Sequence, residues 1–171
     1  MVTSSAATPQ PAPLPVLAQV NIARLKAPLD SPELKAFVDG LDPVNALAEA
    51  ADGFLWRLKS EGGDATDISI FGDEWLIVNM SVWRDVPALT AFMYTGLHRE
   101  FLARRREWFE KVDEAMTALW WVTEGHEPTV AEAEERLLHL REHGPTPHSF
   151  SLRTTFPASE EARTTTSPAA P

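Results

Sequence analysis

The sequence predicts an α+β fold, in which an antiparallel sheet carries helices on one face. Two observations predict this class. Residues 75–83, Trp-Leu-Ile-Val-Asn-Met-Ser-Val-Trp, are rich in β-branched and aromatic residues and contain no Gly or Pro, which is typical of a central strand. Along the rest of the chain, strand and helix patterns follow in the order β-α-β-β-α-β-α-β. The 171 residues suffice for one such domain with a hydrophobic core.

The two faces of this strand differ in character. One face is wholly apolar, as a face covered by helices requires, and consists of Leu76, Val78, Met80 and Val82. The other face holds an amide and a hydroxyl between indoles, and includes Trp75, Asn79, Ser81 and Trp83. Because a solvated face rarely carries two Trp and a plain core rarely includes Asn, this mixture suits a pocket wall or an interface.

Strands and helices before residue 75 follow from local patterns. Residues 17–25 alternate as a strand does and place Asn21 on a face with a second amide. Ser31 followed by Pro32 begins a helix. The elements predicted here are strands at 17–25, 54–58 and 68–71, and helices at 32–40 and 43–50.

Helices after residue 83 are marked by capping residues. Asp85 begins a helix that runs into Tyr94. Thr129 and Glu132 form a capping box, and Gly144 ends the helix that this box begins. The other elements predicted here are a long helix at 97–116 and strands at 119–123 and 150–156.

Both ends of the chain lack apolar periodicity. Residues 1–15 and 158–171 consist largely of Ala, Ser, Thr and Pro, so we expect two disordered tails. Residues 16–157 then form a single ferredoxin-like domain. The start of the chain has neither the basic segment nor the apolar segment of a signal peptide, so we expect a cytoplasmic protein.

Composition excludes several classes of protein. The net charge of −10 argues against a nucleic-acid partner. No run of eighteen apolar residues is present, so we expect no membrane partner. The absence of cysteine excludes disulfides, thiolate metal sites and cysteine nucleophiles. Glycine-rich phosphate loops, G-x-S-x-G elbows and H-E-x-x-H motifs are also missing.

An uncovered sheet face predicts a homodimer. If the helices lie on one face, the opposite face would expose a large apolar surface, which a monomer rarely leaves wet. Two such sheets facing one another would form a dimeric α+β barrel with a lined interior. The residues expected to contact a ligand there are Asn21, Trp56, Asn79, Ser81, Trp83 and Trp121, with Tyr94 and Trp108 from the helices.

Two polar residues fall within the apolar arc of the helix predicted at 97–116. His98 and Arg105 are seven residues apart, so both lie on one face, two turns from each other. In one interpretation they are structural, a core histidine bonded to a carbonyl and an arginine paired with a carboxylate. In the other they are the candidate catalytic residues of a pocket, an acid or base beside an anion contact.

A metal site receives little support from the sequence. His139 and His143 have the i, i+4 spacing that can bind zinc, but no third ligand with suitable spacing is evident. We therefore expect no metal site and no bound cofactor. Haem is the one cofactor left open, through a role of His98 as an iron ligand.

Several short motifs resemble one bacterial family, the domain of unknown function 3291. They are His98-Arg-Glu, Arg105-Arg-Glu-Trp-Phe109, Leu119-Trp-Trp121, Gly125-His126, Pro128-Thr129, Glu132-Ala133 with Arg136, and Gly144-Pro-Thr146. The resemblance covers about residues 16–157 and implies the dimeric α+β barrel group, which includes antibiotic-biosynthesis monooxygenases and haem-degrading enzymes. In the haem-degrading enzymes, an Asn on the first strand, a Trp on a later strand and a His on the following helix line the pocket. Asn21, Trp83 and His98 resemble these three residues by their position in the chain.

Two classes of function remain open. One is an enzyme that acts on a small aromatic or polyketide-like molecule in the barrel, as a monooxygenase that is cofactor-independent or haem-dependent. The other is a non-catalytic protein that binds a small molecule or haem.

Overall fold

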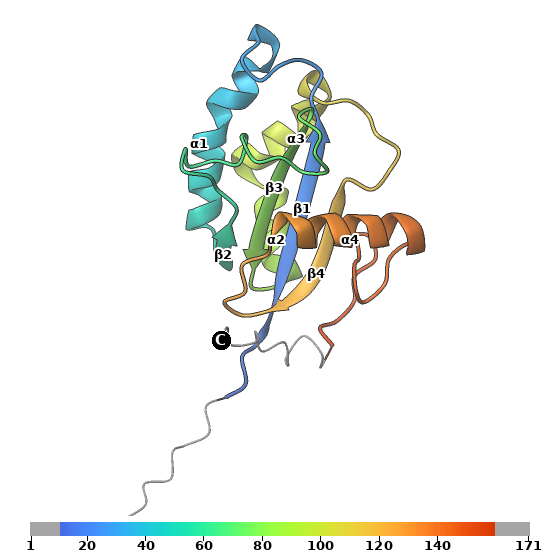
Figure 1. Cartoon of the computed structure of the whole chain (residues 1–171). Coiled ribbons are helices and arrows are strands. Elements are labelled where there is room, and N and C mark those ends of the chain that lie inside the picture. The colour runs from blue at the N-terminus through green and yellow to red at the C-terminus, as the bar shows by residue number, and fades with distance from the viewer. Residues whose placement is uncertain (1–10, 160–171) are drawn as a thin grey trace, which may run out of the picture.

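A four-stranded antiparallel sheet forms the centre of the protein, as the computed structural model of residues 11–159 shows (Figure 1). Its strands are β1 (Pro15–Arg24), β2 (Phe54–Arg57), β3 (Leu76–Trp83) and β4 (Thr117–Thr123), in the order β2-β3-β1-β4. The register places Gln19 opposite Ser81 and Asn21 opposite Asn79. Strand order and helix connections are those of an α+β ferredoxin-like fold, which confirms the predicted class.

Four α-helices and one short 3₁₀-helix connect the strands. They are η1 (Pro32–Leu34), α1 (Lys35–Ala50), α2 (Val86–Met93), α3 (Gly96–Trp108) and α4 (Val130–His143). Predicted caps are present: the Asp85 carboxylate accepts from the amide of Ala88, and the Thr129 hydroxyl accepts from the amide of Glu132. Within residues 11–159, no helix is long and apolar enough to cross a membrane.

One face of the sheet packs against α4 and the segment that precedes β3. Figure 1 shows α4 in front of the sheet, with α2 and α3 behind it. The β-strand side chains of this core include Val20, Met80 and Trp120, and α4 contributes Leu137. The 58–71 segment adds Ile70, which is fully buried.

The opposite face packs against α1, α2 and α3. Leu17 and Trp83 of the sheet contact Ala48 of α1 and Leu89 of α2. Trp108, at the end of α3, forms a further small core with Leu25 and Leu34 at one end of the sheet.

Helices therefore cover both faces of the sheet, and the prediction of one uncovered face is wrong. Trp83 and Ser81, expected on that open face, are 1% and 6% exposed within a single chain. α4 packs on the face predicted to carry helices, whereas α1, α2 and α3 pack on the face predicted to be open. The strand pattern distinguishes the two faces, but it does not say which helices pack on each, because that depends on contacts distant in sequence. The homodimer stays a prediction, although the open apolar face that motivated it is absent.

Several predicted element boundaries are also corrected. The helices at 32–40 and 43–50 are one helix, α1, which continues through Pro43 because α1 packs along β2 and α3. The helix at 97–116 ends at Trp108, since Phe109 is extended and pairs with Leu25.

The strands at 68–71 and 150–156 are isolated bridges. Ile70 pairs only with Asp73 across a tight turn, in which Phe71 has a φ of 54°. Phe150 pairs with Leu119 at the edge of β4. Both segments supply buried side chains to the core without extending the sheet.

The predicted tails lie mostly outside the described residues. Residues 1–10 and 160–171 are not described, so the prediction of disorder there is untested. Residues 11–14 are exposed and have no secondary structure, whereas Pro15, assigned to the tail, begins β1.

Candidate functional site

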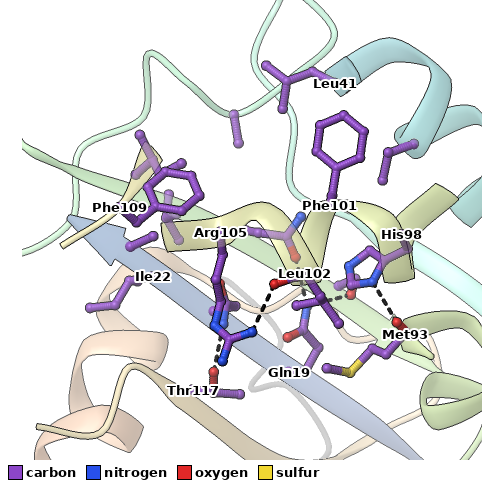
Figure 2. A pocket seen from close by; sticks show the side chains of 18 of the residues that line it. Gln19, Ile22, Leu41, Met93, His98, Phe101, Leu102, Arg105, Phe109 and Thr117 are labelled. Carbon is purple, nitrogen blue, oxygen red and sulfur yellow. Dashed lines mark hydrogen bonds between the residues drawn. The ribbon is translucent and has the colours of Figure 1, made fainter. Parts of the chain in front are cut away.

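A cavity of about 450 Å³ lies between the sheet and helices α1 and α3 (Figure 2). Polar side chains of β1 and β3 line its sheet side: Gln19, Asn21, Asn79 and Ser81. Its helical walls are mainly apolar, with Phe37 and Leu41 from α1 and Phe101 and Leu102 from α3. A concave, mostly apolar space with a few polar groups is typical of a small-molecule site.

The polar groups on the sheet side form one hydrogen-bonded row. The side-chain amide of Gln19 donates to Asn79 Oδ1 and to Ser81 Oγ, both at 2.8 Å. The indole of Trp83 also donates to Ser81 Oγ at 2.8 Å. Because Ser81 accepts twice, its own hydroxyl hydrogen remains available, as do the amide hydrogens of Asn79. Across residues 11–159, neither group has an acceptor of its own.

His98 lines the cavity in a defined tautomer. Its Nδ1 lies 2.9 Å from the carbonyl oxygen of Met93, the last residue of α2. Since a carbonyl can only accept, Nδ1 carries the hydrogen and Nε2 keeps its lone pair in the neutral ring. Burial lowers the pKa of His98, while the bond to Met93 opposes part of this shift. The neutral form, with Nε2 as a base or ligand atom, is therefore favoured near pH 7.

Arg105 lies two turns along α3 from His98, about 10 Å away at 1.5 Å per residue. Its guanidinium lines the cavity and donates to the carbonyl of Leu102 at 2.8 Å. Arg105 is exposed, which corrects the expectation of a buried arginine; the helix presents it at the edge of the apolar arc. No carboxylate of residues 11–159 forms an ion pair with it, so the structural interpretation of Arg105 lacks its partner.

Seven of the ten residues predicted for the site line one cavity. His98, Trp108 and Arg105 come from α3, Asn21 from β1, and Asn79, Ser81 and Trp83 from β3. This cavity lies inside a single chain and is covered by α1 and α3, whereas the prediction placed it between two sheets.

Three predicted ligand contacts lie elsewhere. Trp56 packs in the core on the α4 side, because a register shift in β2 gives the position opposite Trp83 to Phe54. Trp121 donates its indole hydrogen to the carbonyl of Phe156. Tyr94, the residue after α2, is 55% exposed and absent from the cavity lining.

Two residues missed by sequence reasoning shape the cavity wall. Gly40 of α1 faces Phe101 of α3 so closely that a Cβ at Gly40 would lie 1.8 Å from Phe101 Cζ. Gly40 was interpreted as a helix stop; a glycine inside a longer helix would instead have signalled close packing. Gln19 was noted among the amides of the first strand, but its role in joining Asn79 to Ser81 depends on the strand register.

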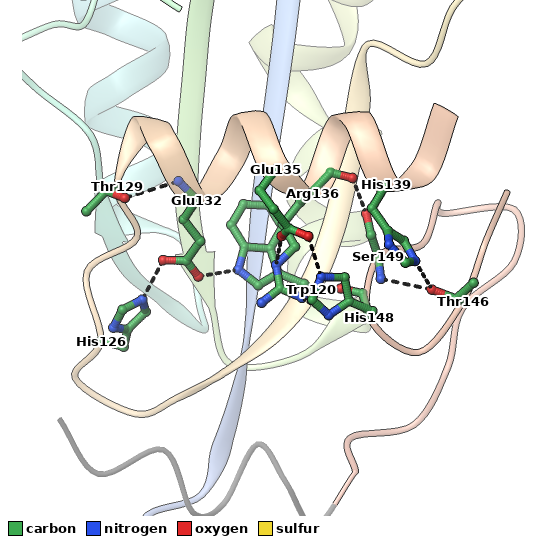
Figure 3. A network of polar contacts seen from close by, with 10 residues as sticks. All are labelled: Trp120, His126, Thr129, Glu132, Glu135, Arg136, His139, Thr146, His148 and Ser149. Atoms are coloured by element: carbon green, nitrogen blue, oxygen red, sulfur yellow. Dashed lines mark hydrogen bonds and ion pairs between the residues drawn. The ribbon is translucent and has the colours of Figure 1, made fainter. Parts of the chain in front are cut away.

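A separate polar network lies along α4 (Figure 3). Glu132 accepts from the fully buried indole of Trp120 at 2.8 Å and contacts His126 Nε2 at 2.7 Å. These contacts fix the 123–129 loop against the helix, so the motif residues of this region have a structural explanation.

Three potential metal ligands meet at the other end of α4, a group that contains His139 but not His143, with which the sequence spacing had paired it. Ligand atoms of Glu135, His139 and His148 lie within 4.8 Å of one another. However, the Arg136 guanidinium donates to His148 Nδ1 at 2.7 Å, so Nε2 carries the hydrogen that reaches Glu135 at 2.7 Å. A fixed cation beside His148 disfavours a metal ion, and the network serves to hold the 144–149 loop on α4.

Comparison with known proteins places the chain in a family. The family model described as "Domain of unknown function (DUF3291)" matches residues 16–166. No curated protein matches the chain. The fold and cavity thus define an α+β ferredoxin-like protein with an internal pocket. The chain belongs to the DUF3291 family.

Solved structures with a related fold include three bacterial proteins. PA3566 from Pseudomonas aeruginosa is 16% identical, with a TM-score of 0.43 and coverage of 65% of this chain and 95% of that one. A protein named "Putative antibiotic biosynthesis monooxygenase" from Nitrosomonas europaea is 10% identical, with a TM-score of 0.44 and coverage of 67% and 94%. Rv0793 from Mycobacterium tuberculosis is 15% identical, with a TM-score of 0.40 and coverage of 68% and 100%. Likeness at this level says nothing about activity.

Proposed function

We propose that the protein binds a small aromatic or polyketide-like acid in the cavity, and that His98 acts on it as a base. The observation that carries this proposal is the pairing of a neutral His98 with an Arg105 guanidinium; among residues 11–159, the His98 Nε2 lone pair has no hydrogen-bond partner and Arg105 has no carboxylate partner. Both groups line one cavity whose α1 and α3 walls are mainly apolar, and whose lining also includes the charged residues Arg57, Asp64, Arg106, Glu110 and Glu114. This combination suits a ligand with an aromatic body and an anionic or hydroxyl-bearing end.

The groups around the cavity have complementary roles in this proposal. Arg105 would bind the anionic end, and the free hydrogens of Asn79 and Ser81 would donate to a carbonyl or phenol oxygen. His98 Nε2 would accept a proton from a hydroxyl or an activated carbon of the ligand. The finer form of the proposal is a monooxygenase without a bound metal, in which a ring CH2 group reacts with dioxygen after deprotonation: one oxygen atom becomes a ring carbonyl and the other leaves as water with the two hydrogens of the carbon.

A non-catalytic binding protein is the second candidate, and haem is the ligand that one observation favours. The Nδ1 of His98 donates to a backbone carbonyl, which is the arrangement that orients a histidine for metal ligation through Nε2. His98 would hold the iron and Arg105 could pair with a propionate. A Soret band on haemin titration that is lost in His98→Ala would favour this candidate, whereas turnover of a bound aromatic acid would favour the enzyme.

The role of Arg105 can be tested with two fluorescent probes that share a ring system. Anilinonaphthalene sulfonate is anionic, and phenylnaphthylamine lacks the sulfonate. We expect Arg105→Gln to weaken binding of the sulfonate about 3- to 10-fold, a range that allows for the exposure of Arg105, and to leave the neutral probe unchanged.

The matched control is Arg99→Gln, which removes a cation from the same helix away from the cavity lining. Equal weakening of the sulfonate probe by both substitutions would show a general effect of net charge. That result would contradict an anion contact at Arg105.

A further inference from the structure

A second cavity, also of about 450 Å³, lies beside the first. It is a surface groove between the end of α1, the start of α3 and the length of α2. Its walls include Leu47 of α1, Ala51 directly after α1, Ala91 of α2 and Leu97 of α3. Phe92 and His98 line both this groove and the central cavity, so the two spaces meet at these side chains.

The groove suits an uncharged apolar occupant. Leu47 is 49% exposed there and adds to the apolar surface of the groove, together with Ala51, Ala91 and Leu97. The charged residues at its edge neutralise one another, since Arg84 pairs with Asp52 at 2.9 Å. No unpaired charge of the groove is therefore directed at a bound molecule, in contrast to Arg105 in the central cavity.

Side chains, rather than backbone, separate the two spaces. Phe92 stacks on Trp83 at a centroid distance of 5.2 Å and tilts against the ring of His98 at 4.8 Å. Phe92 is only half-buried, and no hydrogen bond of residues 11–159 holds its ring in place, whereas His98 is fixed by its bond to Met93. Rotation of the Phe92 ring alone would therefore join the two spaces, without movement of the helices.

We propose that the natural ligand has two parts: an aromatic acid head in the central cavity and an alkyl or acyl tail in the groove. This inference rests on the proposed function, because the head occupies the site of Arg105 and His98. The tail passes His98, which places the bond between head and tail next to Nε2. The ligand class is thus an alkyl- or acyl-substituted aromatic acid rather than a compact aromatic molecule.

The test uses para-methylbenzoate and para-octylbenzoate as competitors of the bound sulfonate probe. Both carry the same head, and only the second has a tail. In the wild-type protein, we expect the octyl compound to compete at least about tenfold more strongly, since each buried methylene favours binding. In Ala91→Trp, whose indole fills the groove, this advantage should fall to about twofold or less while competition by the methyl compound is unchanged.

Two further variants make the outcome decisive. Ala103→Trp, on an exposed part of α3 outside both cavities, should keep the full advantage of the tail. Leu47→Trp, which fills the groove from α1, should also reduce the advantage of the octyl compound to about twofold or less. This second variant keeps the test usable if Ala91→Trp folds poorly. An octyl advantage that survives both groove substitutions would overturn the tail site alone. Failure of both benzoates to displace the probe would overturn the aromatic-acid head, and with it the proposed function.

Discussion

Trp83→Ala should lower the free energy of unfolding by about 3–5 kcal/mol, the usual cost of removing a large buried aromatic side chain. Trp83 is 1% exposed, stacks on Phe92 and meets Phe54 edge-on at 5.5 Å. Its indole also donates to Ser81, which would lose one of its two donors. Urea denaturation followed by circular dichroism measures this loss.

Trp75→Ala is the matched control at the other end of the same segment. Trp75 is 47% exposed and lies just before β3, so its removal should change stability by no more than about 0.5 kcal/mol. A similar loss in the Trp75 variant would show that Trp75 is covered in solution, as an interface between two copies at this end of the sheet would require.

Gly40→Ala should close the cavity. A Cβ at this position would overlap the ring of Phe101, at 1.8 Å from Cζ and 2.5 Å from one Cε. Phe101 lines the cavity, so a ring displaced from Gly40 into that space should weaken binding of the sulfonate probe at least about tenfold. Replacing glycine by alanine inside a helix normally stabilises it by roughly 1 kcal/mol. The overlap with Phe101 should offset this gain, so the free energy of unfolding should not rise.

Phe101→Ala provides the corresponding double-mutant cycle. Without the phenyl ring, Gly40→Ala should stabilise the protein by up to about 1 kcal/mol, because only the helix propensity remains. A substitution at Gly40 that is equally harmful in both backgrounds would show that Phe101 is not the obstacle. The close approach of α1 to α3 would then have another cause.

Local signals in the sequence predicted much of the fold. The alternation of residues 75–83 corresponds to β3, and the capping residues Asp85 and Thr129 mark the starts of α2 and α4 as the structure has them. Gly144 ends α4 with a φ of 71°, where glycine carries no steric cost. Each of these features depends on neighbours within a few residues.

Features set by distant contacts could not be predicted in the same way. The helical pattern continues past Trp108, but Phe109 leaves the helix to pair with Leu25, more than eighty positions earlier. Likewise, α1, α2 and α3 cover the sheet face that was expected to be open, whereas α4 covers the face where all the helices were expected, and only tertiary packing decides that choice.

Those residues of the candidate site that share one helix or one strand could be predicted from the sequence. His98 and Arg105 share a helix, and Asn79, Ser81 and Trp83 share a strand face, so periodicity alone groups them. Trp56 was misplaced because the register shift in β2 changes the face of its side chain. The contribution of Gly40 required knowledge of which helix packs beside it.

The indole hydrogens of the six tryptophans provide the most direct test of the central cavity as the binding site. Trp83 and Trp108 line the cavity, whereas the lining includes none of Trp56, Trp75, Trp120 and Trp121. In a ¹H–¹⁵N NMR titration with the sulfonate probe, we expect saturable shifts of the Trp83 and Trp108 indole signals while the other four stay in place. Shifts confined to those four indoles, or none at all with bound probe, would contradict the cavity as the functional site.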